Sequence, residues 1–289
     1  MKRPIVKSFW DETTGSWQYV FHDPATLKGA VVDPVLDFDR RAGAVTHGNA
    51  DRILEYIAET GIEVVWILDT HPHADHFSAA QYLKHKLGAP TAIGEKVTGV
   101  QALWRDYYHL PDQPVDGSAW DRLFADGETF MVGDLEVSVM FTPGHTLATI
   151  TYVVGDAAFV NDTFMMPDAG TSRADFPGGN SADLYASLQR ILALPDETRL
   201  FVGHDYGPDG REPACCATVA EHKARNKHLS GDVSEADYRA TRDARDATLP
   251  LPDLMLYALQ VNIRGGRLPE PEADGRSYLK VPVDLFEPR

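Results

Sequence analysis

The feature that most constrains this chain is a cluster of three histidines and one aspartate within six residues, His71-Pro72-His73-Ala74-Asp75-His76. Imidazole and carboxylate are the ligand types that zinc and iron prefer in proteins. The cluster follows the apolar run 63–70, which is typical of a buried strand. Because side chains at the end of a rigid strand are held firmly, the pattern favours a metal-binding active site over a polar loop with chance histidines.

The composition indicates a globular protein with an acidic surface. The chain has 289 residues, of which 43% are hydrophobic, and a formal net charge of −16. Clustered Lys and Arg are needed to bind nucleic acid or an anionic membrane, so we expect neither as a partner. No apolar run approaches the roughly 18 residues of a membrane-spanning helix. A small anionic substrate remains compatible with this charge, since it needs only a few local basic residues.

The N-terminal residues and the cysteines predict a cytoplasmic protein. Residues 1–7 are basic, but residues 8–12 contain no apolar segment of the kind found in a secretory signal. The two cysteines, Cys215 and Cys216, are adjacent and cannot close a useful disulfide loop, which fits a reducing compartment. We expect buried or half-buried thiols at these positions, with redox activity as the alternative.

The order of the expected elements predicts two sheets packed face to face with helices outside, an α+β fold of four αββα layers. One helix is expected over 49–61, with Asn49 or Asp51 as its N-cap and Gly61 as its end. The other expected helices are 77–87, 97–108, 181–194 and a helical region reaching to about 263. The expected strands are 16–21, 29–33, 63–70, 129–132, 133–141, 150–154, 157–160 and 199–202. We expect a single domain over 1–289, with a core to about residue 206 and a helical C-terminal extension over 207–289.

Three further expected strands end in residues that can bind a metal. They lead to His145 in the segment 142–146, to Asp162 in 161–163, and to His204 in 203–206. Taken singly, Asp162 is typical of a turn or capping residue, and His204 of a surface histidine. Four such strand ends in one chain favour a common metal site.

In their order and spacing, these motifs resemble the metallo-β-lactamase superfamily from about residue 29 to 206. The resemblance implies an αββα sandwich with its metal site at one edge of the two sheets. In the superfamily's binuclear hydrolases, such as glyoxalase II-like hydroxyacylglutathione hydrolases, seven residues hold two metal ions, commonly zinc. One ion is held by the matches of His71, His73 and His145, the second by those of Asp75, His76 and His204, and the match of Asp162 bridges both. All seven are present here, so a hydrolase with two Zn(II) is one implied function.

A second set of residues resembles the persulfide dioxygenases, also called sulfur dioxygenases. The segment 173–176, Arg-Ala-Asp-Phe, resembles their Arg-x-Asp-Phe signature, and 261–266 resembles their C-terminal end. This likeness implies one Fe(II) per chain held by His71, His145 and Asp162, with open positions for O₂ and a persulfide sulfur. The four remaining residues would then orient the ligands and hydrogen-bond to bound water: His73, Asp75, His76 and His204.

The same likeness implies substrate-binding roles for Arg173, Tyr206 and Arg264, with Asp175 in the surrounding network. The alternatives are a simple salt bridge between Arg173 and Asp175, and a solvated Arg264. Arginine is suited to clamping a substrate carboxylate.

The favoured function is the oxidation of glutathione persulfide, or a related low-molecular-weight persulfide, by O₂ to sulfite plus the thiol, in sulfide detoxification. The alternative is the zinc hydrolase, and a sensor or scaffold protein is a third reading. Apolar side chains within 251–259 are compatible with a homo-oligomer, a dimer or a tetramer, and equally with packing against the sandwich.

Overall fold

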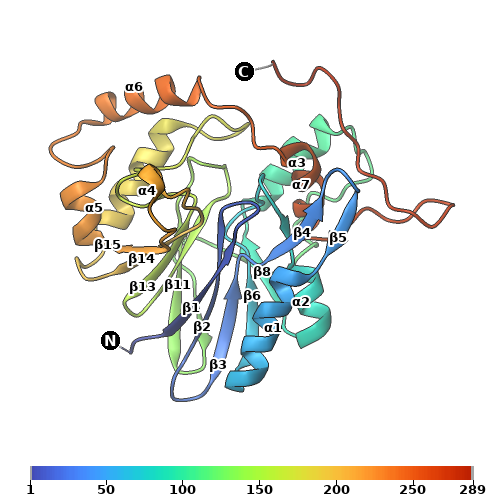
Figure 1. Cartoon of the computed structure of the whole chain (residues 1–289), viewed down its shortest axis with the longest axis horizontal. Helices are drawn as coiled ribbons and strands as arrows, with labels where there is room; N and C mark the ends of the chain where they lie inside the picture. Colours follow the sequence, from blue (N-terminus) through green and yellow to red (C-terminus); the bar gives the residue numbers. More distant parts are fainter. Residues whose placement is uncertain (1, 288–289) are drawn as a thin grey trace.

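Two six-stranded sheets pack face to face at the centre of the molecule, and helices cover the outer face of each sheet (Figure 1). The computed structural model describes residues 2–287. In spatial order, the first sheet consists of β1 (Ile5–Asp11), β2 (Ser16–His22), β3 (Lys28–Val32), β6 (Glu63–Leu68), β8 (Thr91–Gly94) and β9 (Arg122–Phe124). The second consists of β10 (Thr129–Val132), β11 (Leu135–Phe141), β12 (Ile150–Val154), β13 (Ala157–Asn161), β14 (Arg199–Val202) and β15 (Cys216–Thr218).

The helices complete the four αββα layers that the sequence predicts. The first sheet is covered by α1 (Gly48–Thr60), α2 (Ala80–Leu87) and α7 (Met255–Asn262), and the second by α4 (Ser181–Leu192), α5 (Val219–Arg225) and α6 (Glu235–Asp246). Helix α3 (Val97–Tyr107) packs beside α7. A small third sheet joins β5 (Ala44–Thr46), β4 (Val35–Asp39) and β7 (Phe77–Ser78), and a short 3₁₀ helix spans Pro208–Gly210.

Alternating side chains of the central strands form the apolar layers. Tyr19 and Phe21 face the opposite sheet, whereas Val20 between them faces the helices. In β13, Phe159 lies between the sheets and Val160 packs toward α4. Because both faces of each sheet are covered, these strands are nearly continuous apolar runs in the sequence.

The directions of the strands bring several carboxyl ends to one edge of the sandwich. Strands β3 and β6 are parallel neighbours, and so are β13 and β14. Strand β11 runs in the same direction as β13, because β12 between them is antiparallel to both. Two backbone hydrogen bonds join the sheets at this edge, from Trp17 to Gly203 at 2.7 Å and from Ile150 to Thr70 at 3.1 Å. The loops that follow these strands therefore meet at a common edge.

Some expected boundaries are wrong. The N-cap of α1 is His47, and the N–H of Asn49 donates to Asp37 Oδ2 at 3.0 Å, so neither Asn49 nor Asp51 is the cap. The helix expected over 77–87 begins only at residue 80, because β7 pairs with β4. Seven strands were not expected: β1, β4, β5, β7, β8, β9 and β15. The segment after residue 206 is built into the sandwich, since β15 completes the second sheet and α7 covers the first.

Cys215 and Cys216 are free and half-buried, as expected of structural thiols. Burial raises the pKa of Cys215, and burial together with the neighbouring Cys215 raises the pKa of Cys216 to about 12. Both side chains therefore remain thiols at neutral pH, which lowers their reactivity.

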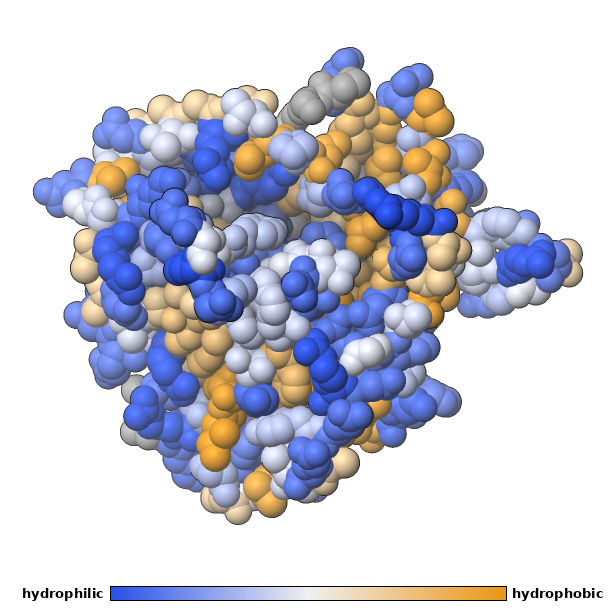
Figure 2. Space-filling model, viewed as in Figure 1, coloured by the Kyte–Doolittle hydropathy of each residue, from blue (hydrophilic) through white to orange (hydrophobic). Residues whose placement is uncertain are grey.

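The face shown in Figure 2 mixes hydrophilic side chains with separate groups of apolar ones. The C-terminal tail projects from the body on the right of Figure 1. No helix within residues 2–287 combines the length and the apolar character needed to cross a bilayer.

Protonation of a buried histidine on α5 is expected to weaken the fold. His222 is fully buried, its ring meets that of Phe164 with centroids 4.6 Å apart, and burial lowers its pKa to about 4. Because a histidine in the unfolded chain titrates near 6.5, the unfolded state binds more protons between pH 6.5 and pH 4. Stability is therefore complete above this window and falls by about 3 kcal/mol as the pH drops through it.

The measurement is urea unfolding of the wild type and of His222→Gln at neutral pH and near pH 4. The variant should lose less stability on acidification than the wild type. The exposed His85→Gln serves as the control and should follow the wild-type pH dependence. Parallel curves for the wild type and His222→Gln would contradict the prediction.

Candidate metal centre

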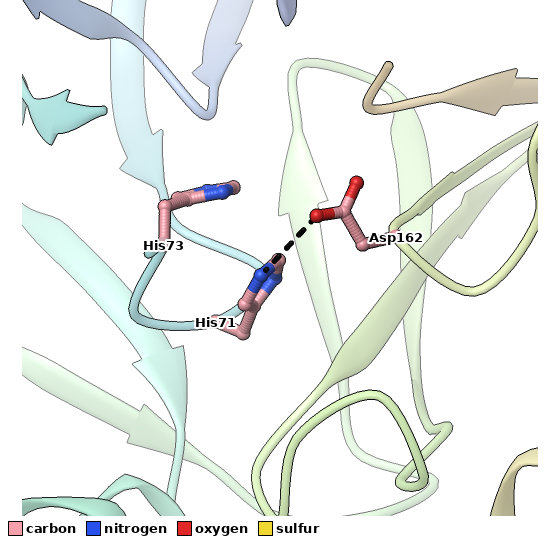
Figure 3. A group of neighbouring side chains, drawn as sticks. All are labelled: His71, His73 and Asp162. Carbon is pink, nitrogen blue, oxygen red and sulfur yellow. Dashed lines mark ion pairs between the residues drawn. The ribbon is translucent and has the colours of Figure 1, made fainter. Parts of the chain in front are cut away.

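The residues predicted to bind metal converge at the edge where the strands end. The loop between β6 and β7 carries His71, His73, Asp75 and His76. The second sheet contributes His145 after β11, Asp162 after β13 and His204 after β14. All of these side chains are buried except Asp75, which is half-buried. Residues from both sheets thus meet in one site, and Figure 3 shows the loop of His71 and His73 facing Asp162.

Asp162 lies at the middle of the site. Its Oδ2 is 3.4 Å from Nε2 of His145 and 3.4 Å from Nε2 of His204. The same oxygen is 3.7 Å from Nε2 of His71, the pair marked in Figure 3. His204 Nε2 is also 3.3 Å from Asp75 Oδ2. Three groups have ligand atoms within 4.8 Å of one another: His71, His73 and Asp162; His73, Asp75 and His76; and Asp75, Asp162 and His204. These clusters support metal binding.

Hydrogen bonds to the protein fix the orientation of two of the histidine rings. His145 Nδ1 donates to the carbonyl oxygen of Arg173 at 2.9 Å, and His204 Nδ1 donates to that of Gly15 at 3.0 Å. Since a carbonyl oxygen only accepts, both Nδ1 atoms carry the proton, and Nε2 of each ring is turned toward the site. Metal-binding histidines are oriented in this way.

Asp33, at the end of β3, orients the loop of the six-residue motif. Its carboxylate accepts hydrogen bonds from the N–H of Thr70 at 2.7 Å, from the Thr70 hydroxyl at 3.0 Å and from His73 Nε2 at 3.1 Å. It also accepts a bond from the side-chain amide of Asn161 in the other sheet. The Thr70 hydroxyl lies 3.1 Å from His71 Nδ1. Because this hydroxyl donates its hydrogen to Asp33, it accepts a hydrogen bond from Nδ1–H of His71. Sequence reasoning missed this role, although Asp33 ends an apolar strand as the other site residues do.

Several buried atoms at the site have no hydrogen-bond partner within residues 2–287. They are His71 Nε2, His73 Nδ1, His76 Nε2 and Asp162 Oδ1. Buried polar atoms are paired in most proteins, so a group of unpaired lone pairs in one place requires an explanation. A metal ion fits this donor set of imidazole nitrogens and carboxylate oxygens.

The charges of the site are mutually stabilising. Burial lowers the pKa of His71 and of His73 well below the usual range, so both are neutral at pH 7. Although burial opposes it, the charges of His204 and His145 hold the pKa of Asp162 below its ordinary value. Burial also disfavours the charged form of His204, yet Asp162 and Asp75 raise its pKa well above the usual range. A metal ion bound by His204 must displace this proton, so its affinity rises with pH.

A cavity of about 420 Å³ opens onto the site. Its base includes Asp75, His145, Asp162 and His204. One wall is apolar and consists of Met165, Phe176, Leu249, Pro250, Leu251 and Pro252. Three arginines also line it, Arg173, Arg242 and Arg245. An apolar wall with a few fixed cations suits a small anionic ligand.

Two of these arginines form ion pairs with carboxylates of the protein. Arg173 forms two hydrogen bonds with Asp175, at 2.7 and 2.9 Å, and a third with the carbonyl of Pro250 at 2.6 Å. The simple salt bridge considered for Arg173 is therefore present, and Arg173 also lines the cavity. Arg242 is buried and bonds to Asp246 at 2.5 Å and to the carbonyl of Thr171 at 2.9 Å.

The other two predicted substrate residues lie in different places. Tyr206 is 69% exposed, and its ring stacks on that of His204 with centroids 5.9 Å apart. Arg264 lines a different cavity, beyond the end of α7, and donates to the carbonyl of Gln260 at 2.6 Å. The structure thus brings Arg173, Asp175 and Tyr206 to the metal centre but not Arg264.

Helix α7 contributes a contact that the sequence did not reveal. The amide of Asn262 donates to the carbonyl of His73 at 2.8 Å and to that of His76 at 2.7 Å. Its oxygen accepts a bond from the N–H of Ser78 at 2.8 Å. The motif resemblance covered Asn262 but gave it no role; in the structure it fixes the backbone of the metal-ligand loop.

Comparison with known proteins places this site in a family. The family model described as the Metallo-beta-lactamase superfamily matches residues 19–204, which include every predicted metal ligand. A "Beta-lactamase hydrolase-like protein" of Agrobacterium fabrum is 61% identical over 98% of this chain, and the chain spans 66% of that relative's length. "Glyoxylase B2" of Dictyostelium discoideum is 42% identical, over 98% of each chain.

More distant relatives carry a different name. "Persulfide dioxygenase ETHE1, mitochondrial" of Homo sapiens is 24% identical over 91% of this chain and 89% of its own length. The crystal structure of ETHE1 from Myxococcus xanthus is 30% identical, with a TM-score of 0.73 over 91% of this chain and 100% of that chain. The names of the relatives thus divide between hydrolases and dioxygenases.

Proposed function

This chain belongs to the metallo-β-lactamase superfamily and is an enzyme of that superfamily, and from this premise we propose that it is an iron-dependent persulfide dioxygenase. Glutathione persulfide, or a related low-molecular-weight persulfide, would react with O₂ and water to give the thiol, sulfite and two protons. The observation that carries the proposal is the contact between the Arg-x-Asp-Phe segment and the metal centre. The carbonyl of Arg173 orients His145, and the ring of Phe176 meets the His145 ring edge-on at 5.1 Å. The 30% identity with ETHE1 from Myxococcus xanthus over all of that chain also supports it.

Three residues would hold the metal in this proposal: His71, His145 and Asp162. When bound, ferrous iron supplies an electron donor with open positions for O₂ and the persulfide sulfur. The apolar wall that includes Phe176 would lie beside the reacting sulfur and limit the access of bulk water to it. His204 would not bind the metal in this proposal; its Nε2 lies 3.3 Å from Asp75 Oδ2 and 3.4 Å from Asp162 Oδ2, so it would orient the ligand Asp162.

Arg245 is the residue that we propose to bind a substrate carboxylate. It lines the cavity, is exposed, and forms no ion pair within residues 2–287. Arg173 is ion-paired with Asp175, and Arg242 is ion-paired with Asp246, so the charges of both are compensated within the protein. Arg245 is therefore the cation of this cavity whose charge is available to a ligand.

Replacing Arg245 by glutamine should raise KM for the persulfide about tenfold while kcat changes little, because one charged hydrogen bond to bound substrate is lost. Oxygen-uptake kinetics at varied persulfide concentration provide the measurement. Arg239→Gln is the matched control, since Arg239 lies on the same helix and, among residues 2–287, forms its one ion pair with Glu235. A lower kcat with an unchanged KM would contradict the assignment.

The proposed function is tested on one protein preparation loaded with Fe(II) without oxygen. Iron content is measured first, then oxygen uptake and sulfite formation on addition of glutathione persulfide. About one iron per chain and one sulfite per O₂ consumed would support the proposal. Iron-loaded protein that consumes no O₂ with any low-molecular-weight persulfide would overturn it.

A binuclear zinc hydrolase of the glyoxalase II type is the second candidate. It is favoured by the presence of all seven ligand residues and by the unpaired His73 Nδ1 and His76 Nε2. The 42% identity with "Glyoxylase B2" points in the same direction. Two zinc ions per chain with cleavage of an acylglutathione thioester would establish this function, whereas zinc-loaded protein without thioesterase activity would exclude it.

A further inference from the structure

A second cavity lies beyond the carboxyl end of α7 and has no assigned role. Its volume is about 440 Å³, within the range of small-molecule sites. Gln101 of α3 and the loop after this helix form one side, and the turn and tail after α7 form the other. It shares no lining residue with the cavity at the metal centre. That cavity is lined by residues just before α7, so the two are separated by a helix of eight residues, about 12 Å long.

The cavity gathers three cations on a strongly acidic chain. Arg264, Arg267 and Lys280 line it, together with the carboxylates Asp112 and Glu270. Within residues 2–287, none of the three cations lies at ion-pair distance from a carboxylate. With three cations and two carboxylates, the lining of this cavity has a formal charge of +1, opposite in sign to the net charge of −16 on the chain.

Hydrogen bonds to the backbone hold two of these cations in position. Arg264 Nη1 donates to the carbonyl of Gln260 at 2.6 Å, and Lys280 Nζ donates to that of His109 at 2.9 Å. The side chain of Gln260 also bonds to both backbone groups of Lys280, at 2.8 and 2.9 Å. The tail is thus fixed against α7. The two charges are preorganised by neutral carbonyls and remain available to a ligand.

Arg264 has donors left for such a ligand. A guanidinium carries five N–H donors, and the helix carbonyl accepts from only one of its nitrogens. The side chain is half-buried, and burial lowers its pKa, with the charge of Glu270 opposing this. A half-buried guanidinium in a cavity is suited to the paired oxygens of a phosphate-like group.

We propose that this cavity binds a small oxyanion carrying two negative charges, of the phosphate or sulfate class. Arg264 and Arg267 donate to its oxygens, and Lys280 adds a point charge. The site is separate from the substrate cavity at the metal centre and does not depend on which reaction the metal centre performs.

The test is calorimetric titration of the full chain with inorganic phosphate at constant ionic strength. We expect one saturable site per chain. Arg267→Gln and Lys280→Gln change exposed side chains and should each weaken binding about tenfold. Arg239→Gln removes the same charge on α6 and should leave phosphate binding unchanged.

Three outcomes would overturn the proposal. The first is the absence of saturable phosphate binding. The second is an equal loss of affinity in Arg239→Gln, which would indicate a general charge effect. The third is phosphate binding that is lost in Arg245→Gln but kept in Arg267→Gln, which would place the anion at the metal centre. Retained binding in Arg239→Gln and Arg245→Gln, with loss in Arg267→Gln and Lys280→Gln, would support it.

Discussion

Replacing His145 by alanine is expected to abolish iron binding and reduce persulfide-dependent O₂ uptake by more than about a hundredfold, because one of three proposed ligands is lost. The same change at His204 should reduce activity only about 10- to 100-fold, the range typical of residues that support ligands without binding the metal. In the structure both imidazoles lie 3.4 Å from the same oxygen of Asp162. A different effect of the two substitutions would therefore distinguish a metal ligand from a supporting residue. The measurements are iron content after anaerobic loading and kcat/KM from oxygen uptake.

The hydrolase candidate predicts a different pattern for this pair. With two metal ions, His145 and His204 would each hold one ion, and both variants would lose metal and activity to a similar extent. Equal loss of iron in the two variants would therefore contradict the dioxygenase proposal. His85→Ala, at an exposed position, controls for preparation and loading.

Replacing Asp33 by asparagine is expected to lower the free energy of unfolding by at least about 3 kcal/mol, because it brings amide hydrogens against buried donors. Asp33 is 2% exposed and accepts bonds from Thr70, His73 and Asn161. Burial raises the pKa of Asp33 to about 6, although the hydrogen bonds from Thr70 lower it, so the carboxyl group is mostly ionised at pH 7. Metal affinity should fall as well, since His71 and His73 lose their orientation.

Urea unfolding at pH 7 and a metal titration measure the two effects of Asp33→Asn. Asp39→Asn is the matched control, because Asp39 is exposed and its side chain accepts local backbone hydrogen bonds from Arg41 and Ala42. The control should stay within about 0.5 kcal/mol of the wild type. A similarly small change in Asp33→Asn would show that Asp33 does not organise the loop.

The sequence was sufficient to predict the layers and the gathering of the candidate ligand residues at one edge of the sandwich. Buried strands such as β6 and β13 are continuous apolar runs, and each ends in a ligand-type residue, so one periodicity argument located both the strands and the site. Strands β8 and β15 were missed because they are only four and three residues long and depend on pairing with distant partners. Local patterns carry little information about such pairing.

Local sequence patterns also could not predict the contacts that support the site. Asn262 bonds to the backbone of His73 across 189 positions of the chain, and Asn161 bonds to Asp33 across 128. Arg264 was expected near the substrate, but it follows a helix whose length moves it to another cavity. These contacts and positions arise from tertiary packing, and the spacing of residues along the chain does not predict them.

The metal-ligand residues come from loops of both sheets, and this arrangement links the stability of the protein in a cell to metal binding. An ion bound at this edge joins the two halves of the sandwich in the folded state and has no comparable site in the unfolded chain. Its binding free energy therefore adds to the free energy of unfolding. Chains made during metal shortage would open more often and be degraded sooner. The abundance of this enzyme would then follow the supply of its metal, without any separate regulator.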